Sequence, residues 1–547
     1  MGIFDDYPPK DLWPDIVFPD EVDLPEEFNL CDRLLERHII EGRGDNIAIY
    51  YGEQRITFNE MSEKVNRLGN SLLSLGVTPQ DRVGIKLVNQ PEALILIFAV
   101  QKIGAVPVLF SRLWSKKEDS YVINCAGIRF FFVSESLLRT ENEYRNQMAY
   151  DGEIAVVEEQ DQVRERSTVH SYLAMIQKGK QNLSGIKMKR DDLGLIMFTS
   201  GTTGMPKGCL HSIGTLLSQG LLANKYVYNL QEGDILTGAS PVAFAAGYVI
   251  FAVLPFIGGA TVSLIPKFEP KAVLETIQNH RATVLTGVPA SYRRLLEYGD
   301  FGKYDLSSLR LCTTSADAIK ETGPEWAFRT GLDIWEGYGS SEVAFLVAHN
   351  RVGGKIKLGS VGNAIPGWDI RIVDDEGEKV QSGEIGRLLT KGPAGCRYLI
   401  RGQDKQRSLE AQRKGVRNGW NCSGDMAYMD EDGAIYLVSR EDDMIKTGGF
   451  RVYPSEIEEA LIKHPSVRDA CVVGVPNDVR GFDVSACLVL EEEVDDNARL
   501  IEKLVSFLKE HLSVYKLPRS FKFVNELPRT PTGKIMRRRV KQEIYDL

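Results

Sequence analysis

The stretch from Leu193 to Gly208, LGLIMFTSGTTGMPKG, is the most informative part of the chain. Its first six residues are apolar, which is typical of a buried strand. The ten residues that begin at Thr199 combine glycines, hydroxyl side chains and one lysine, Lys207. Glycines let backbone N–H groups approach phosphate oxygens, and hydroxyl groups and a lysine add donors and positive charge. The stretch therefore predicts a strand followed by a phosphate-binding loop.

This loop differs from the common Gly-x-x-x-x-Gly-Lys-Ser/Thr phosphate loop, because Lys207 follows Met-Pro and precedes Gly208. An ordinary flexible loop rich in serine, threonine and glycine is the alternative interpretation. The position directly after a buried strand favours phosphate binding. The predicted phosphate-binding residues of the loop are Thr199, Ser200, Gly201, Thr202, Thr203, Gly204 and Lys207.

Helical and strand-like segments alternate on both sides of this loop. Apolar residues at three- and four-residue steps predict helices over 58–76 and 92–105, and apolar runs predict strands over 81–88 and 106–110. Residues 282–298 repeat the strand-to-helix pattern. Alternation of this kind favours an α/β fold, with a large N-terminal domain of parallel or mixed sheets covered by helices.

The later part of the chain has a different pattern of turn residues and apolar runs. Turn residues at Asp375–Gly377 and Ser382–Gly383 predict antiparallel hairpins, and so a small barrel-like antiparallel part over about 360–440. After Arg440, two strand-like runs and one long amphipathic helix predict a small α+β unit of about a hundred residues. We therefore expect a large N-terminal domain, 1–441, and a small mobile C-terminal domain, 442–547.

Composition limits the class of protein. The chain has 547 residues, 43% hydrophobic and 26% charged, which excludes collagen-like, disordered and disulfide-scaffold proteins. The formal net charge of -9 argues against a nucleic-acid partner. The eight cysteines are scattered without a Cys-x-x-Cys pair, which favours buried, reduced thiols. The acidic, Pro-rich N-terminal stretch lacks a secretory signal pattern, so we expect a cytoplasmic location.

One segment is long and apolar enough to suggest a membrane span. Residues 235–266 contain no charged residue. Pro255 and the pair Gly258-Gly259 interrupt the segment, which favours a helix, a turn and a buried strand. We expect no stable membrane insertion, and a membrane transport protein is the competing interpretation.

Four further motifs follow the loop in order: YGSSE at 338–342, WNCSGD at 420–425, SREDDMIKTGG at 439–449 and PTGK at 531–534. Together with the loop they resemble the adenylate-forming superfamily, which includes acyl- and aryl-CoA synthetases, luciferases and adenylation domains. The resemblance covers nearly the whole chain. It implies that a carboxylic acid reacts with ATP to give acyl-AMP and pyrophosphate, and that coenzyme A then takes the acyl group and AMP leaves. ATP, Mg²⁺ and coenzyme A are the implied co-substrates, with no prosthetic group.

The resemblance implies catalytic roles for Thr199, Lys207, Glu342 and Lys534. Glu342 offers a carboxylate oxygen of the kind that Mg²⁺ accepts, and Lys534 is expected to bridge the substrate carboxylate and the α-phosphate. The implied ATP- or AMP-binding residues are Thr199, Ser200, Gly201, Thr202, Thr203, Gly204, Lys207, Ser315, Ala316, Asp317, Glu336, Gly337, Tyr338, Gly339, Ser340, Ser341, Asp425, Arg440 and Lys534. Within this set, the ring of Tyr338 suits adenine, Asp425 suits the ribose hydroxyls, and Arg440 can bridge ribose and phosphate.

Residues 442–449 carry two further expectations. Asp442 matches the hinge about which the small domain is expected to turn between the two half-reactions, and a solvated linker is the alternative interpretation. Lys446, Gly448 and Gly449 are expected to contact coenzyme A, because glycines leave room for a narrow pantetheine chain. A turn before a strand is the alternative interpretation of the glycine pair.

The acid is less well specified than the nucleotide. The strings KGPAGCRYL, beginning at Lys391, and GWNCSGD, beginning at Gly419, are similar to those of benzoate- and 2-aminobenzoate-CoA ligases. The expected pocket residues, each of which core packing explains equally well, are Phe244, Ala245, Ala246, Gly247, Gly337, Gly339 and Phe345.

Two departures from the family pattern bear on the acid. Ala246 stands where a bulkier residue is frequent, and 343–347 lacks the histidine that such ligases often carry. A third departure, Ser341 where threonine is usual, belongs to the nucleotide motif. A wider, apolar pocket suits an aromatic or alicyclic carboxylate, and a short or medium aliphatic acid is the next choice. An adenylation enzyme that loads a carrier protein and a luciferase-like oxygenase share the same motifs. The sequence leaves the oligomeric state open, a homodimer included.

Overall fold

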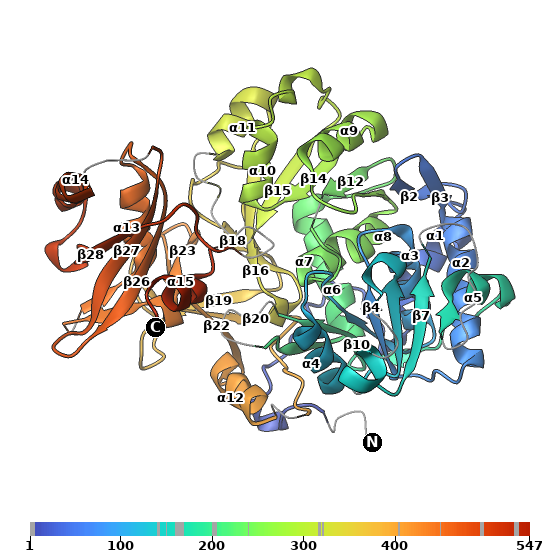
Figure 1. The fold of residues 1–547 in the computed structure, drawn as a ribbon. Coiled ribbons are helices and arrows are strands. Elements are labelled where there is room, and N and C mark those ends of the chain that lie inside the picture. The colour runs from blue at the N-terminus through green and yellow to red at the C-terminus, as the bar shows by residue number, and fades with distance from the viewer. Residues whose placement is uncertain are drawn as a thin grey trace. The chain divides into compact units, whose positions relative to one another are not determined.

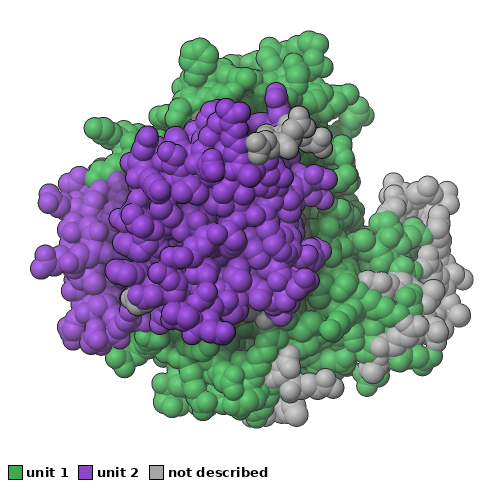
Figure 2. All heavy atoms as spheres, turned by 60° about the vertical axis from the view of Figure 1, so that its left-hand side comes forward, with its two compact units in different colours: residues 1–201, 205–370, 390–421 green, residues 202–204, 371–389, 422–547 purple. Residues whose placement is uncertain are grey.

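The structure is a computed structural model of the chain, and it describes residues 6–138, 143–148, 150–158, 169–199, 205–238, 240–315, 319, 322–402, 405–448, 450–492, 497–529 and 535–547. The chain divides into two compact units (Figure 2). The first unit consists of 1–201, 205–370 and 390–421, and the second of 202–204, 371–389 and 422–547.

The first unit contains two large sheets. In spatial order, the seven-stranded sheet consists of β11 (Gly208–Ser212), β10 (Leu193–Phe198), β5 (Val106–Leu109), β4 (Arg82–Lys86), β6 (Phe130–Ser134), β7 (Glu153–Val157) and β8 (His170–Ser171). The nine-stranded sheet consists of β18 (Asn363–Ala364), β17 (Leu346–His349), β16 (Ile334–Gly339), β15 (Leu311–Ser315), β14 (Val284–Gly287), β12 (Ile235–Gly238), β13 (Thr261–Leu264), β2 (Ile47–Tyr51) and β3 (Gln54–Thr57). A two-stranded pair joins β1 (Glu27–Phe28) to β9 (Met188–Lys189).

Both large sheets are mainly parallel, with antiparallel strands at their edges. β4, β5, β6, β7 and β10 pair in parallel in the first sheet, and β12 to β16 do so in the second. The pairs β10–β11, β16–β17 and β2–β3 are antiparallel. The predicted parallel or mixed sheets of an α/β domain are therefore confirmed.

Helices cover these sheets and also fill the space beside them. The helices of the first unit are α1 (Arg37–Ile40), α2 (Phe58–Ser74), α3 (Pro91–Lys102), α4 (Lys116–Ala126), α5 (Tyr172–Lys178), α6 (Ile213–Ala223), α7 (Ala245–Tyr248), α8 (Leu254–Gly258), α9 (Pro270–His280), α10 (Pro289–Leu296), α11 (Thr322–Thr330) and α12 (Lys405–Gly415). Helices α2 and α5 lie side by side near β7 (Figure 1). Helix α3 contacts β4 and β5, α6 contacts β10 and β11, and α8 contacts β13. α3 and α6 are apolar nearly all round and are almost wholly buried, which is typical of helices in an interior layer.

Local sequence explains where the predicted helices begin. Thr57 precedes α2 and accepts from the backbone N–H of Glu60, whose side chain in turn accepts from the backbone N–H of Thr57. This capping box satisfies N–H groups that the first helical turn leaves without partners. The buried residues of α2, such as Met61, Val65, Leu68 and Leu72, recur at helical spacing, as the sequence predicts.

The apolar segment 235–266 folds as strand, helix, turn and strand. β12 is followed by α7, a π-helical stretch Val249–Val253, α8 and β13. Pro255 lies in the first turn of α8, and Gly259 ends that helix at φ +70°, a left-handed conformation that glycine adopts without strain. No helix in the described part of the chain is long and apolar enough to cross a membrane.

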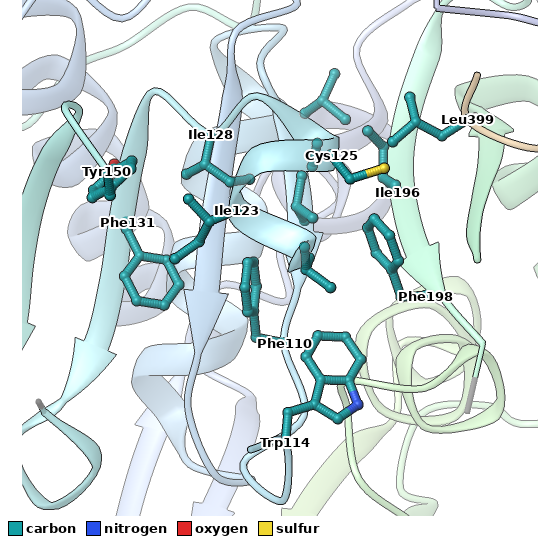
Figure 3. Close-up of a cluster of buried hydrophobic side chains, with 14 of the residues drawn as sticks. Phe110, Trp114, Ile123, Cys125, Ile128, Phe131, Tyr150, Ile196, Phe198 and Leu399 are labelled. Atoms are coloured by element: carbon teal, nitrogen blue, oxygen red, sulfur yellow. The ribbon is translucent and has the colours of Figure 1, made fainter. Parts of the chain in front are cut away.

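The largest apolar clusters lie against the sheets. Figure 3 shows side chains of one cluster beside β10, among them Phe110, Phe131, Ile196 and Phe198. A second cluster joins α9, α10 and α11 to one face of β14, β15 and β16. All eight cysteines are free thiols and seven are buried, which confirms the prediction of reduced thiols, with Cys422 half-buried.

The second unit contains most of an antiparallel sheet and a small α+β assembly. The antiparallel sheet consists of β19 (Asp369–Val373), β20 (Gly386–Lys391), β22 (Trp420–Met429), β21 (Val416–Arg417) and β23 (Ile435–Arg440). The other sheet consists of β25 (Phe450–Val452), β24 (Ile445–Thr447), β27 (Gly481–Leu490), β26 (Val467–Asn477) and β28 (Ser520–Phe523). The helices of this α+β assembly are α13 (Pro454–Ile462), α14 (Asn497–His511) and α15 (Arg537–Ile544). The antiparallel part and the α+β part are those expected from the sequence.

The compact units divide the chain differently from the predicted domains. Residues 371–389 and 422–441 belong to the same unit as the C-terminal part, whereas the sequence places them in the larger domain. The two units are defined by how closely their residues pack. The predicted boundary at 441/442 is instead the point about which the C-terminal domain is expected to rotate. The hinge boundary therefore stays a prediction.

Candidate functional site

The base of the predicted phosphate loop is a hairpin between β10 and β11. Phe198 and Gly208 lie opposite each other at the ends of the two strands. The backbone N–H of Thr199 donates to the carbonyl of Lys207 at 2.9 Å, and the N–H of Lys207 donates to Oγ1 of Thr199 at 3.4 Å. Two of the predicted catalytic residues therefore lie together. The loop residues between them that carry the phosphate-binding prediction, Ser200, Gly201, Thr202, Thr203 and Gly204, lie outside the described residues.

A distant segment of the chain lies along the other side of β11. Leu210 N donates to the carbonyl of Arg397, and Leu399 N donates to that of Gly208, both at 2.8 Å. This pairing places Tyr398 opposite Cys209, directly after the loop. The segment belongs to the string KGPAGCRYL that resembles aromatic-acid ligases.

Tyr398 contacts two of the predicted catalytic side chains. Its hydroxyl donates to Oε1 of Glu342 at 2.8 Å, and the Lys207 ammonium lies 4.8 Å from the centre of its ring. Burial, together with nearby groups that include the Glu342 carboxylate, raises the pKa of Tyr398 well above its usual value. The phenol therefore stays protonated and donates. Tyr398 was not predicted from the sequence as a site residue. The one feature that could have indicated it is its place in the string KGPAGCRYL, which is similar to that of aromatic-acid ligases.

Replacement of Tyr398 by phenylalanine should slow acyl-adenylate formation by about ten- to a hundredfold, the usual effect of losing a hydrogen bond to a charged group. The ring beside Lys207 is kept, but the Glu342 carboxylate loses the donor that orients it. Pyrophosphate exchange measured at increasing Mg²⁺ concentration checks this, and more Mg²⁺ should be needed for half-maximal rate. Tyr292→Phe is the control, because its buried hydroxyl donates, among the described residues, to the backbone carbonyls of Leu285 and Thr313. An unchanged Mg²⁺ requirement in Tyr398→Phe would contradict the expectation.

The carboxyl ends of β15 and β16 carry the next group of predicted residues. Ser315 lies opposite Gly337, and Glu336 to Gly339 end the neighbouring strand. Ligands of α/β proteins bind at such carboxyl edges. Glu336 is buried, and its Oε1 accepts from the backbone N–H of Ile319 at 2.8 Å. Tyr338 is also buried, and the predicted residues Ala316 and Asp317 lie outside the described part of the chain.

Gly337 and Gly339 also have a packing reason to be glycine. A Cβ on Gly337 would lie 2.6 Å from Cδ2 of His349, and one on Gly339 would lie 1.8 Å from the carbonyl oxygen of Phe345. Side chains are therefore excluded at both positions by the close approach of β17 and the turn before it. The two glycines are explained by the fold whether or not they also contact a ligand.

Phe345, one of the predicted pocket residues, is buried against Tyr228. The two rings are nearly parallel with centroids 6.3 Å apart, and the Tyr228 hydroxyl lies 3.4 Å from Oγ1 of Thr313. Burial raises the pKa of Tyr228 to about 12, so this group stays neutral. Tyr228 was not identified from the sequence.

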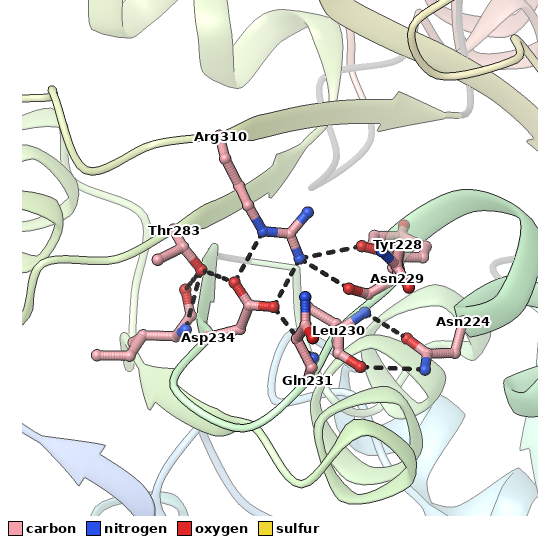
Figure 4. A network of polar contacts seen from close by, with 9 residues as sticks. Asn224, Tyr228, Asn229, Leu230, Gln231, Asp234, Thr283 and Arg310 are labelled. Carbon is pink, nitrogen blue, oxygen red and sulfur yellow. Dashed lines mark hydrogen bonds and ion pairs between the residues drawn. The ribbon is translucent and has the colours of Figure 1, made fainter.

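A polar network holds the chain around Tyr228 (Figure 4). Arg310 donates through Nε and Nη2 to the two carboxylate oxygens of Asp234 at 2.8 and 2.7 Å, and through Nη2 to the carbonyls of Tyr228 and Asn229. Thr283 donates to the same carboxylate at 2.7 Å. Asp234, Thr283 and Arg310 each directly precede a strand of the nine-stranded sheet, so this network lies at its amino edge and serves structure.

The other predicted pocket residues form the beginning of α7. Phe244 precedes the helix, Ala245 and Gly247 are buried, and Ala246 is half-buried. A Cβ on Gly247 would lie 2.0 Å from the carbonyl oxygen of Pro241. Within the described residues, no recorded hydrogen bond or ring contact joins these four to Gly337 or Phe345. A common pocket therefore stays a prediction.

In the second unit, the predicted ribose residues lie side by side. Asp425 of β22 and Arg440 of β23 are directly opposite in the antiparallel pair, and Nη1 of Arg440 lies 2.9 Å from Oδ1 of Asp425. A hydroxyl acceptor and a guanidinium donor therefore face the same point. Their role in binding the ribose stays a prediction.

The predicted hinge lies between two anchored neighbours. Glu441 pairs with Arg387 at 2.8 Å, Asp443 pairs with Arg537 at 3.3 Å, and Asp442 between them is exposed. Further along, Lys446 is exposed on β24 and Gly448 has φ +55°. The remaining predicted residues of this unit, Gly449 and Lys534, lie outside the described residues.

The described residues contain no cluster of three or more histidine, cysteine or carboxylate side chains that could hold a metal ion. Glu342, the predicted Mg²⁺ ligand, contacts Tyr398, whose ring lies beside Lys207 at the base of the loop. Mg²⁺ is commonly held by one or two carboxylates together with substrate phosphates. The donor set of this chain fits an ion that is shared with a nucleotide.

The chain is similar to known enzymes along nearly its whole length. The sequence model of the AMP-binding enzyme family matches 35–399, and that of the AMP-binding enzyme C-terminal domain matches 456–534. The benzoate–CoA ligase of Thauera aromatica is 29% identical over 95% of this chain and 97% of its own length. The long-chain-fatty-acid–CoA ligase of Bacillus subtilis is 28% identical over 95% and 96%. A crystal structure of an anthranilate CoA ligase with anthranoyl-AMP superimposes with a TM-score of 0.85, at 30% identity over 96% of this chain and 99% of that one.

Proposed function

The chain belongs to the AMP-binding enzyme family and is an AMP-forming acid–thiol ligase, and on this premise we propose that it activates an aromatic or alicyclic carboxylate with ATP and transfers the acyl group to coenzyme A. The contact of Tyr398 with both Lys207 and Glu342 carries the proposal for the nucleotide site, since it joins a phosphate-binding cation to a carboxylate.

In the first half-reaction, a carboxylate oxygen of the acid attacks the α-phosphorus of ATP. The new O–P bond forms as the bond to the β-phosphate oxygen breaks, and pyrophosphate leaves. Both reactants are anions, so their approach requires oriented positive charge and N–H donors. Lys207 and Thr199 at the base of the loop, and Lys534 from the C-terminal part, are the groups that we assign to this task.

Mg²⁺ bound to Glu342 and the phosphates would neutralise part of the phosphate charge. Tyr398 donates to Oε1 of Glu342 through its hydroxyl, and so orients the carboxylate that would hold the ion. Asp425 and Arg440 are assigned to the ribose and phosphate, which their side-by-side position supports.

In the second half-reaction, the thiol of coenzyme A attacks the acyl carbonyl, loses its proton, and displaces AMP. No nucleophilic side chain is needed for this step. We assign the hinge to Asp442, about which the C-terminal domain turns and withdraws Lys534. Lys446, Gly448 and Gly449 then accommodate the pantetheine chain.

The relatives support a cyclic acid without specifying it. Benzoate and anthranilate are the acids in the names of two of them, and both carry a carboxylate on a ring. The long-chain-fatty-acid relative has nearly the same identity, so an aliphatic acid is the alternative substrate. An acyl carrier protein is the alternative thiol.

A screen tests the proposal. Carboxylic acids are incubated with ATP, Mg²⁺ and coenzyme A, and AMP release is measured. We expect AMP release with benzoate-like or cyclohexane-type acids, at a kcat/KM at least about tenfold above that for acetate or decanoate, because a pocket shaped for a ring discriminates by about 1–3 kcal/mol. Acids are compared with and without coenzyme A to separate adenylation from transfer. A higher kcat/KM for the aliphatic acids would contradict the cyclic class.

A further inference from the structure

A row of three residues crosses β15, β16 and β17 at their functional edge. Ser315 lies opposite Gly337, and Gly337 lies opposite His349. Residues directly opposite in neighbouring strands project to the same face of a sheet. Ser315 and His349 therefore flank Gly337, which has no side chain, on one face of the nine-stranded sheet.

The imidazole of His349 extends over Gly337. A Cβ built on Gly337 would lie 2.6 Å from Cδ2 of His349 and 3.0 Å from Cδ2 of Leu346. Cδ2 is bonded to Nε2, so this edge of the ring is the one beside Gly337. Gly339, the other proposed pocket residue of β16, follows a register shift in the pairing with β17. A Cβ on Gly339 would lie 2.9 Å from Cα of Leu346, the residue that also borders Gly337.

Hydrogen bonding determines which nitrogen of His349 carries the proton. Nδ1 lies 2.6 Å from the carbonyl oxygen of Asn350, and a carbonyl only accepts, so Nδ1 carries the hydrogen. Burial lowers the pKa of His349 to about 4, so the ring is neutral near pH 7. Nε2 of the neutral ring therefore presents a lone pair, which accepts a hydrogen bond.

Nε2 of His349 has no partner among the residues that the structure describes. The residue is 5% exposed and Nε2 itself is buried, so solvent does not replace the missing donor. A buried polar atom without a hydrogen bond costs about 1–3 kcal/mol, so its presence calls for an explanation, and a donor on a bound ligand is one.

Among the described residues, neutral and apolar groups lie on this face, and Asn363 of β18 is directly opposite His349. Tyr228, Phe345 and Leu346 are buried there, and Thr313 lies two residues before Ser315 on the same side of β15. The absence of histidine from 343–347 predicts a wholly apolar pocket. β17 returns beside β16 and brings a histidine from outside that window to Gly337.

We propose that Nε2 of His349 accepts a hydrogen bond from a hydroxyl or amino group on the ring of the acid, so that the preferred substrate is a donor-substituted aromatic or alicyclic carboxylate. This rests on the proposed function and narrows its substrate class. An acceptor at this place favours a ring O–H or N–H over a methyl, fluoro or methoxy group, none of which donates.

The test compares acids in matched pairs. The kcat/KM of each hydroxy- and aminobenzoate isomer is measured beside the methylbenzoate with its substituent at the same ring position. For at least one position the wild-type protein should prefer the donor acid by about tenfold or more, since a pocket that hydrogen-bonds a substrate group rejects the analogue without it. If the wild-type protein shows no such preference at any ring position, the inference is overturned. This part of the test requires no variant.

Two variants attribute the preference to His349. In His349→Leu the donor-to-methyl ratio should fall to about one, while in His349→Gln, whose amide oxygen also accepts, part of the preference should remain. His38→Leu is the control, because His38 is also buried but its Nε2 is hydrogen-bonded to the carbonyl of Phe256, and this variant should leave the ratio unchanged. A ratio that persists in His349→Leu would overturn the role of His349.

The outcomes also separate this inference from the proposed function. If only aliphatic acids release AMP, the cyclic class itself fails. If cyclic acids react but donor and methyl acids are equivalent, the proposed function stands and the role of His349 fails.

Discussion

Replacement of Lys534 by alanine is expected to slow acyl-adenylate formation by about two to three orders of magnitude, which is the usual effect of removing a donor that stabilises developing charge. The reason is that acid and ATP are both anions, and the ammonium of Lys534 would bridge the carboxylate and the α-phosphate. Thioester formation from presynthesised acyl-AMP should be largely retained, because Lys534 is withdrawn for that step in the proposed mechanism.

Pyrophosphate exchange measures the first half-reaction, and thioester release from added acyl-AMP measures the second. Arg538→Ala is the matched control, since Arg538 is an exposed cation of α15 near the same end of the chain. Equal losses in both half-reactions of Lys534→Ala would contradict the assignment of Lys534 to adenylation alone.

Replacement of Gly449 by leucine is expected to leave adenylation nearly intact and to reduce thioester formation by at least about a hundredfold. A side chain at this position would fill the path proposed for pantetheine, and overlap with a bound chain is not relieved without displacing it. Pyrophosphate exchange and thioester production are measured on the same preparation.

Gly449→Ala separates side-chain bulk from backbone effects. Alanine imposes the same backbone restriction as leucine but adds a single carbon, so thioester formation should fall much less. If the alanine and leucine variants lose both activities to the same extent, glycine is needed at position 449 for its backbone conformation, and not to leave room for coenzyme A.

Much of the architecture could be predicted because it depends on local patterns. The apolar residues of α2 recur at helical spacing and its cap is a Thr57–Glu60 pair, both of which lie within a short window. The strand before Thr199 and the interrupted segment 235–266 were identified in the same way. The π-helical stretch Val249–Val253 was missed, because its residues have the same apolar character as those of an α-helix.

Whether two residues of the candidate site could be predicted to lie close together depends on their separation along the chain. Thr199 and Lys207 close one hairpin loop, and Asp425 and Arg440 meet across another, so short chain separations bring each pair together. Tyr398, by contrast, meets Glu342 and Lys207 although it is 56 and 191 residues away from them along the chain. Its place follows from the pairing of its segment with β11.

The sequence by itself determined the family motifs, the alternation of helices and strands, and the residue types at the phosphate loop, because each is a property of neighbouring residues. Only the tertiary structure decided that Tyr398 orients Glu342 and that His349 lies over Gly337. Both contacts depend on which strands pair and in what register, and a shift of one residue in β17 would turn His349 to the opposite face. Register is set by the packing of whole sheets, so no local pattern of residues contains it.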